Sequence, residues 1–130
     1  MIVDTSALLA VLFAEPDAER YARAIAETEG CRMSAATFVE AGIVVDTQTD
    51  AAGSRHLDAF LRRAGILIEP VSEEQAHLAR QAYLDFGKGR HPAGLNFGDC
   101  FAYALAKATG EPLLFKGEDF AKTDVVAAEA

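Results

Sequence analysis

The cysteine and histidine spacings that bind zinc are absent from this sequence of 130 residues. Cys31 and Cys100 form neither a C-x-x-C pair nor part of a zinc pattern, so we expect free core thiols in a reducing compartment. The three histidines include no pair at positions i and i+4. These absences exclude the common zinc sites, and a bound metal would be a hard cation with oxygen ligands.

Long hydrophobic runs are also absent. The best candidate, ALLAVLFA at residues 7–14, is too short to cross a bilayer and follows Asp4 instead of a basic stretch. We therefore expect a cytoplasmic protein without a membrane partner. Internal repeats and low-complexity tracts are missing as well, and the length is near the commonest domain size, so we expect a single domain over residues 1–130.

Positive charge is scarce. The chain holds 12 Lys and Arg against 20 Asp and Glu, which gives a net charge of −8. Such a chain repels nucleic acid on average, because phosphate binding normally depends on Lys and Arg. A nucleic-acid role would therefore need local basic groups, a bridging metal or a partner.

The order of apolar and polar segments predicts alternating strands and helices. We expect strands at residues 1–4, 31–34, 66–71 and 112–117, with 125–128 as a further candidate. We expect helices at residues 7–14, 16–29, 35–47, 55–65, 72–86 and from about 96 onward, although the Ile-Val-Val run at 43–45 also suits a strand. This alternation predicts an α/β protein with a mostly parallel sheet covered on both faces.

Three acidic side chains stand alone in apolar company. Each is the only charge in a window of at least 13 residues: Asp4, Glu40 and Asp99. Asp4 and Asp99 could simply cap helices, whereas Glu40 lies inside a helix, where it caps nothing. Burying a lone carboxylate costs several kcal/mol unless a partner compensates it, so the three windows together need a common reason.

The predicted topology brings these acids together, because the carboxyl ends of parallel strands share one edge of the sheet. A fourth acid is available in KGEDF, residues 116–120, after the last clear strand. Two carboxylates about 4 Å apart repel by roughly 4 kcal/mol at an effective dielectric constant of 20. A divalent cation or bound protons must therefore compensate the cluster, and Mg²⁺ or Mn²⁺ suits oxygen ligands and phosphate-ester chemistry.

The chain resembles a PIN-domain ribonuclease, specifically a VapC-type toxin of a bacterial toxin-antitoxin pair. The matching pieces, in family order, are MIVDTSALLA, FVEAGIVV, GKGRHPAGLNFGDCFAYALAK and LLFKGEDFAKTDV. The resemblance implies a three-layer α/β/α sandwich and Mg²⁺-dependent endoribonuclease activity, with Mn²⁺ able to substitute. It also implies an RNA substrate, a homodimer and inhibition by a VapB-like antitoxin.

Carried over by position, four residues match the catalytic acids of that family: Asp4, Glu40, Asp99 and Asp119. Asp4 and Asp99 would hold the metal, and Glu40 or Asp119 would orient the attacking water or hold a second ion. Glu118 could also reach the metal, and we favour Asp119. Around them, Ser6 or Thr5 would orient Asp4 or a metal-bound water, unless they only cap a helix. Asn96 would position Asp99 or the substrate, unless it is an ordinary loop residue.

Basic and aromatic residues also lie near the acids in the sequence. The candidates for phosphate contacts are Lys88, Arg90 and Lys116, and the alternative is that they lie in a solvated loop. For His91, which lies beside them, we favour the solvated loop. The nearby aromatic residues are expected in the core and not on a stacking platform: Phe97, Phe101 and Tyr103.

Two rival functions were weighed. A haloacid-dehalogenase-like phosphatase needs a second Asp two residues after the first, and Ser6 stands at that position here. A PIN-like module that has lost catalysis and serves only for dimerisation or antitoxin binding would not need all four acids.

Overall fold

A four-stranded sheet lies at the centre of the computed structural model, which describes residues 1–130. The strand order is β3-β2-β1-β4, and every pairing is parallel. The strands are β1 (Ile2–Val3), β2 (Arg32–Ser34), β3 (Leu67–Glu69) and β4 (Leu113–Leu114). The parallel sheet predicted from the alternation of elements is thereby confirmed.

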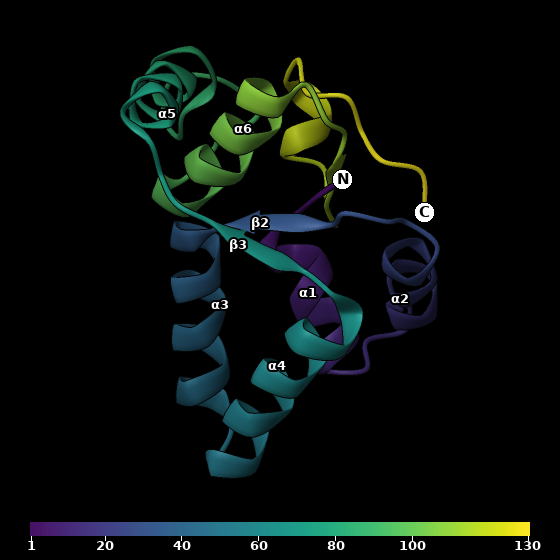
Figure 1. Cartoon of the computed structure of the whole chain (residues 1–130). Helices are drawn as coiled ribbons and strands as arrows, with labels where there is room; N and C mark the ends of the chain where they lie inside the picture. The colour runs from purple at the N-terminus through teal and green to yellow at the C-terminus, as the bar shows by residue number, and fades with distance from the viewer.

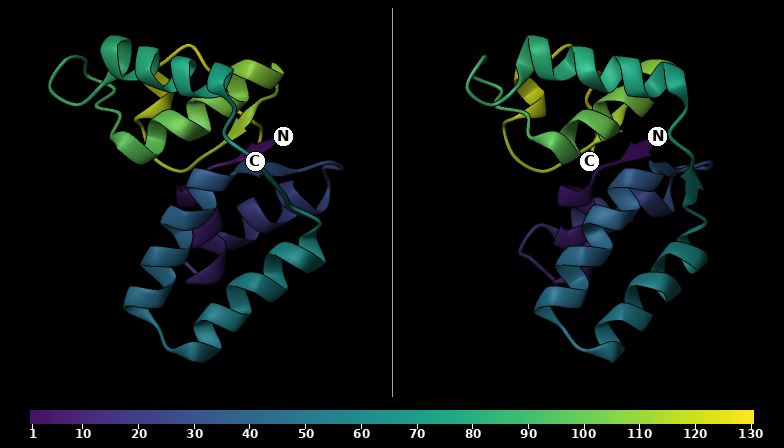
Figure 2. Two further views of the ribbon diagram at one scale, coloured as in Figure 1. Left: turned by 60° about the vertical axis from the view of Figure 1, so that its left-hand side comes forward. Right: turned by 90° about the vertical axis from the view of Figure 1, so that its left-hand side faces the viewer.

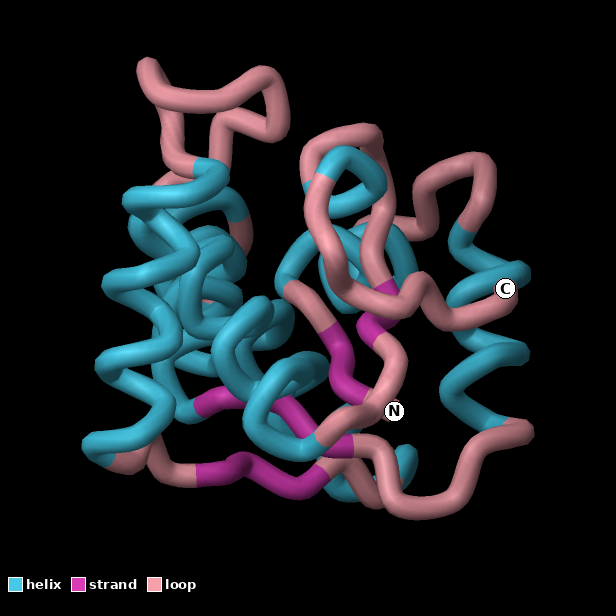
Figure 3. Tube along the Cα trace, turned by 90° about the horizontal axis from the view of Figure 1, so that it is seen from above, coloured by secondary structure: helices cyan, strands magenta, loops and turns pink.

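The strands are short and helices make up most of the chain, as the view from above shows (Figure 3). They are α1 (Thr5–Leu12), α2 (Ala18–Ala26), α3 (Ala35–Gln48), α4 (Ala51–Ala64), α5 (Glu73–Phe86) and α6 (Phe97–Thr109), followed by the 3₁₀ helix η1 (Phe120–Lys122). The helices α1 to α4 lie on one side of the sheet, whereas α5, α6 and η1 lie on the other (Figures 1 and 2). The result is the expected three-layer α/β/α arrangement. None of the helices combines the length and the apolar character that a membrane span requires.

The two central strands supply one core to each face. Ile2 belongs to the hydrophobic cluster beneath α5 and α6, and its neighbour Val3 belongs to the cluster against α1 to α4. Leu113 and Leu114 alternate in the same way. Successive side chains of a strand point to opposite faces, so two residues per strand are enough to join both layers.

Some element boundaries differ from the sequence predictions. The segment 125–128 is not a strand, because its only ladder contact is an isolated parallel bridge between Leu113 and Ala127. The alternative of a strand at 43–45 is wrong, because α3 continues through these residues. The helix expected at 55–65 starts four residues earlier, where the Asp50 side chain accepts hydrogen bonds from two backbone amides of the first turn.

Candidate active site

Asp4 is placed where β1 ends and α1 begins. Its side chain is buried, with only 3% of the residue exposed. Asp4 Oδ2 accepts hydrogen bonds from Ser6 N at 3.0 Å and from Ser6 Oγ at 2.6 Å, whereas the buried Asp4 Oδ1 has no partner. Burial raises the pKa of Asp4, and the hydrogen bonds from Ser6 oppose that shift. One oxygen therefore anchors the carboxylate, and the other is available to a ligand.

Ser6 connects this carboxylate to the next strand. Its hydroxyl donates to Asp4 Oδ2 and accepts a hydrogen bond from the backbone N–H of Lys116 at 2.9 Å, just beyond β4. The backbone N–H of Asp4 donates to Leu114 O at 3.0 Å. The pairing of β1 with β4 thus sets both the main chain and the side chain of Asp4.

Glu40 lies in the second turn of α3, the helix that follows β2. Thr5 Oγ1 donates a hydrogen bond to Glu40 Oε1 at 2.6 Å, so Thr5 orients Glu40, while Ser6 contacts Asp4. The other carboxylate oxygen lies against the start of α6, where a Cβ atom on Gly98 would overlap Glu40 Oε2. Our sequence reasoning did not identify Gly98 as part of the site, and its only signal was its place directly before Asp99.

Asp99 is held by a capping box at the start of α6. The backbone N–H of Asp99 donates to Asn96 Oδ1 at 2.9 Å, and the backbone N–H of Asn96 donates to Asp99 Oδ2 at 3.0 Å. Asn96 is therefore the helix N-cap and positions Asp99. Burial, with added repulsion from Asp4, Glu40 and Asp119, raises the pKa of Asp99 to about 6, although the hydrogen bond from Asn96 opposes the rise. These four acids share one electrostatic environment.

Asp119 precedes η1, and both it and Glu118 are exposed to solvent. Asp119 contributes to the raised pKa of Asp99, which associates it with the other three acids. The side chains are not drawn together into a finished metal cage, because no three His, Cys, Asp or Glu groups lie in a ligating arrangement. An all-oxygen donor set with an unpartnered buried atom, Asp4 Oδ1, nevertheless suits a hard divalent cation.

The basic residues differ in their surroundings. The Lys116 ammonium forms ion pairs with Glu15 and with Asp17, the latter at 2.9 Å, so its charge is already compensated. Lys88 and Arg90 are exposed in the loop that follows α5. The ring of His91 accepts a hydrogen bond at Nδ1 from a backbone amide and packs edge-on against Phe86, which gives it a structural role in that loop.

The three aromatic residues expected in the core are divided by the structure. Tyr103 is buried, and its hydroxyl donates to Asp124 Oδ1 at 2.6 Å. Phe97 is 68% exposed, so the prediction of a core position is wrong for this residue. Phe101 is partly buried and packs edge-to-face with Phe97, with ring centroids 4.9 Å apart.

Comparisons with known proteins bear on the family and the fold of the chain. The family model described as PIN domain matches residues 1–126. Ribonuclease VapC28 of Mycobacterium tuberculosis is 56% identical over 126 residues, which cover 96% of this chain and 95% of that protein. Among solved structures, M. tuberculosis VapC20, titled a Sarcin-Ricin loop cleaving toxin, matches with a TM-score of 0.78 at 16% identity and covers 99% of this chain and 98% of that one. A toxin-antitoxin complex from Klebsiella pneumoniae matches with a TM-score of 0.75 at 16% identity, covering 97% and 94% of the two chains.

The two structural matches, at 16% identity, support the fold alone. The family model and the 56% identical relative each span nearly the whole chain. The chain therefore belongs to the PIN-domain family and, within it, to the VapC ribonucleases.

Proposed function

We propose that this protein is a metal-dependent endoribonuclease, the toxin of a VapBC-type pair, that acts on RNA in the cytoplasm. The observation that carries the proposal is the shared electrostatic environment of four acids at one edge of the sheet, among them a buried carboxylate with an unpartnered oxygen. The 56% identity to a protein named as a ribonuclease supports the same conclusion.

In this proposal Asp4 and Asp99 hold Mg²⁺, for which Mn²⁺ can substitute. When bound, such a cation polarises a phosphate oxygen and lowers the pKa of an attacking water. Glu40, which is fixed by Thr5 and by the start of α6, is set to orient that water. Asp119 is exposed and would serve as a second orienting group or as a ligand of a second ion. Attack by water, as the family resemblance implies, would leave a 5′-phosphate and a 3′-hydroxyl.

Two protein partners belong to the proposal, a VapB-like antitoxin and a second copy of this chain. Membership of the VapC ribonucleases, shown by the 56% identical relative, supports the antitoxin. Exposed apolar side chains on α3 and on the edge strand β3 support a further interface: Val39, Ile43, Leu67 and Ile68. The rival interpretation, a catalytically silent module, predicts the same interfaces without cleavage.

RNA cleavage by purified protein separates these two interpretations. We expect cleavage with Mg²⁺ and none after addition of EDTA. Asp4→Asn should lower cleavage by at least about 100-fold, because losing a residue that merely supports a metal ligand already costs up to about 100-fold and Asp4 is proposed to be a ligand itself. Asp58→Asn, an exposed acid on α4, is the matched control and should cleave as the wild type does. Equal cleavage by Asp4→Asn would point to a contaminating nuclease and refute the assignment.

A further inference from the structure

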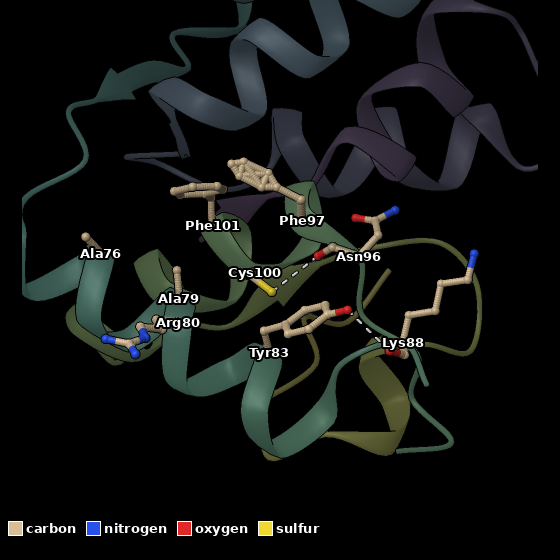
Figure 4. A pocket seen from close by; sticks show the side chains of 9 residues that line it. All are labelled: Ala76, Ala79, Arg80, Tyr83, Lys88, Asn96, Phe97, Cys100 and Phe101. Carbon is tan, nitrogen blue, oxygen red and sulfur yellow. Dashed lines mark hydrogen bonds between the residues drawn. The ribbon is translucent and has the colours of Figure 1, made fainter. Parts of the chain in front are cut away.

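A groove of about 540 Å³ lies between α5 and α6, and Asn96, the N-cap of α6, is among the residues that line it (Figure 4). Its volume falls within the range of small-molecule sites, about 300–1,000 Å³. Alanines of α5 line one wall and leave room there, and the aromatic rings of Tyr83, Phe97 and Phe101 also line the groove. An apolar space of this shape suits a flat group that can lie against an aromatic ring.

The aromatic side chains of the groove are displayed to solvent, which is unusual for residues of their size. Phe97 is 68% exposed and Tyr83 is 40% exposed. Both are held in place, because Phe97 packs edge-to-face on Phe101 and the Tyr83 hydroxyl donates to Lys88 O at 3.3 Å. Exposed rings with fixed neighbours lose little conformational freedom when a ligand covers them.

Positive charge stands at both ends of the groove. Arg80 lies at one end and Lys88 at the other (Figure 4), and neither forms an ion pair within the chain. The chain as a whole carries a net charge of −8, whereas the two basic side chains that flank this apolar groove give it local positive charge. This arrangement complements a flat base with a phosphate on either side of it.

One residue, Asn96, connects the groove with the acids, none of which lines it. Asn96 lines it, and the same residue forms the capping box that holds Asp99. Asn96 thus connects the helix start that carries Asp99 with the lining of the groove.

We propose that this groove binds a base of the RNA adjacent to the cleaved phosphate, stacked on Phe97, with neighbouring phosphates at Arg80 and Lys88. The inference rests on the proposed ribonuclease function and names the way in which the substrate is held. An apolar side chain of a protein partner would also fill the groove, but it would leave both cations without a counter-charge. That occupant is an alternative outcome of the test.

The test compares two fluorescent twelve-nucleotide probes, an oligoadenylate and an all-abasic RNA of the same length. Binding is measured by fluorescence anisotropy in a buffer that contains Ca²⁺ in place of Mg²⁺, so that the probes are bound without being cleaved. A gel confirms that the probes stay intact. Wild-type protein should bind oligoadenylate more tightly. Phe97→Ala should weaken that binding about 5- to 150-fold, the range of one stacked base, and leave abasic binding unchanged, whereas Phe97→Trp should retain it.

The cations give a second, separable readout. Arg80→Gln and Lys88→Gln should weaken binding of both probes and lower the slope of log affinity against log salt by about 0.7 for each lost phosphate contact. Val126→Ala is the matched control, because it removes an exposed apolar side chain of the C-terminal segment away from the groove. Phe97 is largely exposed, so its variants should keep the wild-type melting temperature.

The outcomes also distinguish failure of this inference from failure of the proposed function. If wild-type protein cleaves RNA with Mg²⁺ but Phe97→Ala binds both probes as the wild type does, the groove is not a base site and the ribonuclease assignment stands. If Phe97→Ala instead changes only the dimeric state or the binding of a protein partner, the groove belongs to a protein interface and the inference is overturned. Absence of wild-type cleavage would overturn the function itself.

Discussion

The cost of keeping Asp99 ionised without a metal can be measured as a pH-dependent free energy of unfolding. Burial, then repulsion from the neighbouring acids, raises the pKa of Asp99 from its ordinary value of 3.8 to about 6. Two pKa units correspond to about 3 kcal/mol, and partial exposure of Asp99 reduces this to about 1–2 kcal/mol through solvent screening. The folded state binds this proton more tightly than the unfolded state, so stability falls as the pH rises from about 4 to about 6.

Asp99→Asn removes the charge and keeps a side-chain oxygen that can accept the hydrogen bond from Asn96 N. We expect this variant, in EDTA at about pH 7.5, to be more stable than the wild type by about 1–2 kcal/mol. Its stability should also depend less on pH between about 4 and 6. Part of the slope will remain, because burial raises the pKa of Asp4 as well.

Urea denaturation at a series of pH values measures both quantities, and Asp58→Asn on the exposed face of α4 serves as the control for loss of one negative charge. If Asp99→Asn is less stable than the wild type and its pH slope is unchanged, burial of the Asp99 charge does not destabilise the metal-free protein. In that case the capping box, and not charge burial, would dominate the energetics of Asp99.

Three further predictions follow from the same contacts. Mg²⁺ at about 100 times its dissociation constant should stabilise the wild type by about 2.7 kcal/mol in a thermal shift assay and Asp99→Asn by clearly less; equal shifts would exclude Asp99 as a ligand. Gly98→Ala should displace the Glu40 carboxylate and lower RNA cleavage at least about tenfold. The urea midpoint of Gly98→Ala should not fall, because alanine has a higher helix propensity than glycine. Cleavage at the wild-type rate by this variant would contradict the placement of Glu40. Tyr103→Phe should lose about 1 kcal/mol of stability with unchanged cleavage, since it removes a hydrogen bond to Asp124, which is not one of the four acids; an unchanged urea midpoint would show that this bond contributes nothing.

The sequence was sufficient for the order of elements, and it supported the hypothesis that the acids share one edge of the sheet. Asp4 and Asp119 both follow parallel strands, and the carboxyl ends of such strands share an edge whatever their exact length. The strand boundaries were less predictable, because pairing with a neighbour decides how many residues join the ladder. The sequence predicts a strand over residues 112–117, but in the structure only Leu113 and Leu114 pair with a neighbouring strand.

The details of the site depend on contacts between distant parts of the chain, and the sequence does not record these. The hydrogen bond from Thr5 to Glu40 joins residues 35 positions apart, and the approach of Gly98 to the same carboxylate depends on how α6 packs beside α3. Phe97 illustrates a different limit. An apolar residue in an apolar helix reads as core, and only the assembled layers show that its side of α6 is left uncovered.

The proposed function requires that the four acids form the metal site of a ribonuclease. A manganese titration tests it most directly when free Mn²⁺ is followed by electron paramagnetic resonance and RNA cleavage is measured in the same samples. Cleavage should rise with the fraction of protein that has bound Mn²⁺; Asp4→Asn should lose both binding and cleavage, whereas Asp58→Asn should keep both. Cleavage that does not depend on bound Mn²⁺, or an Asp4→Asn variant that binds and cleaves like the wild type, would contradict it.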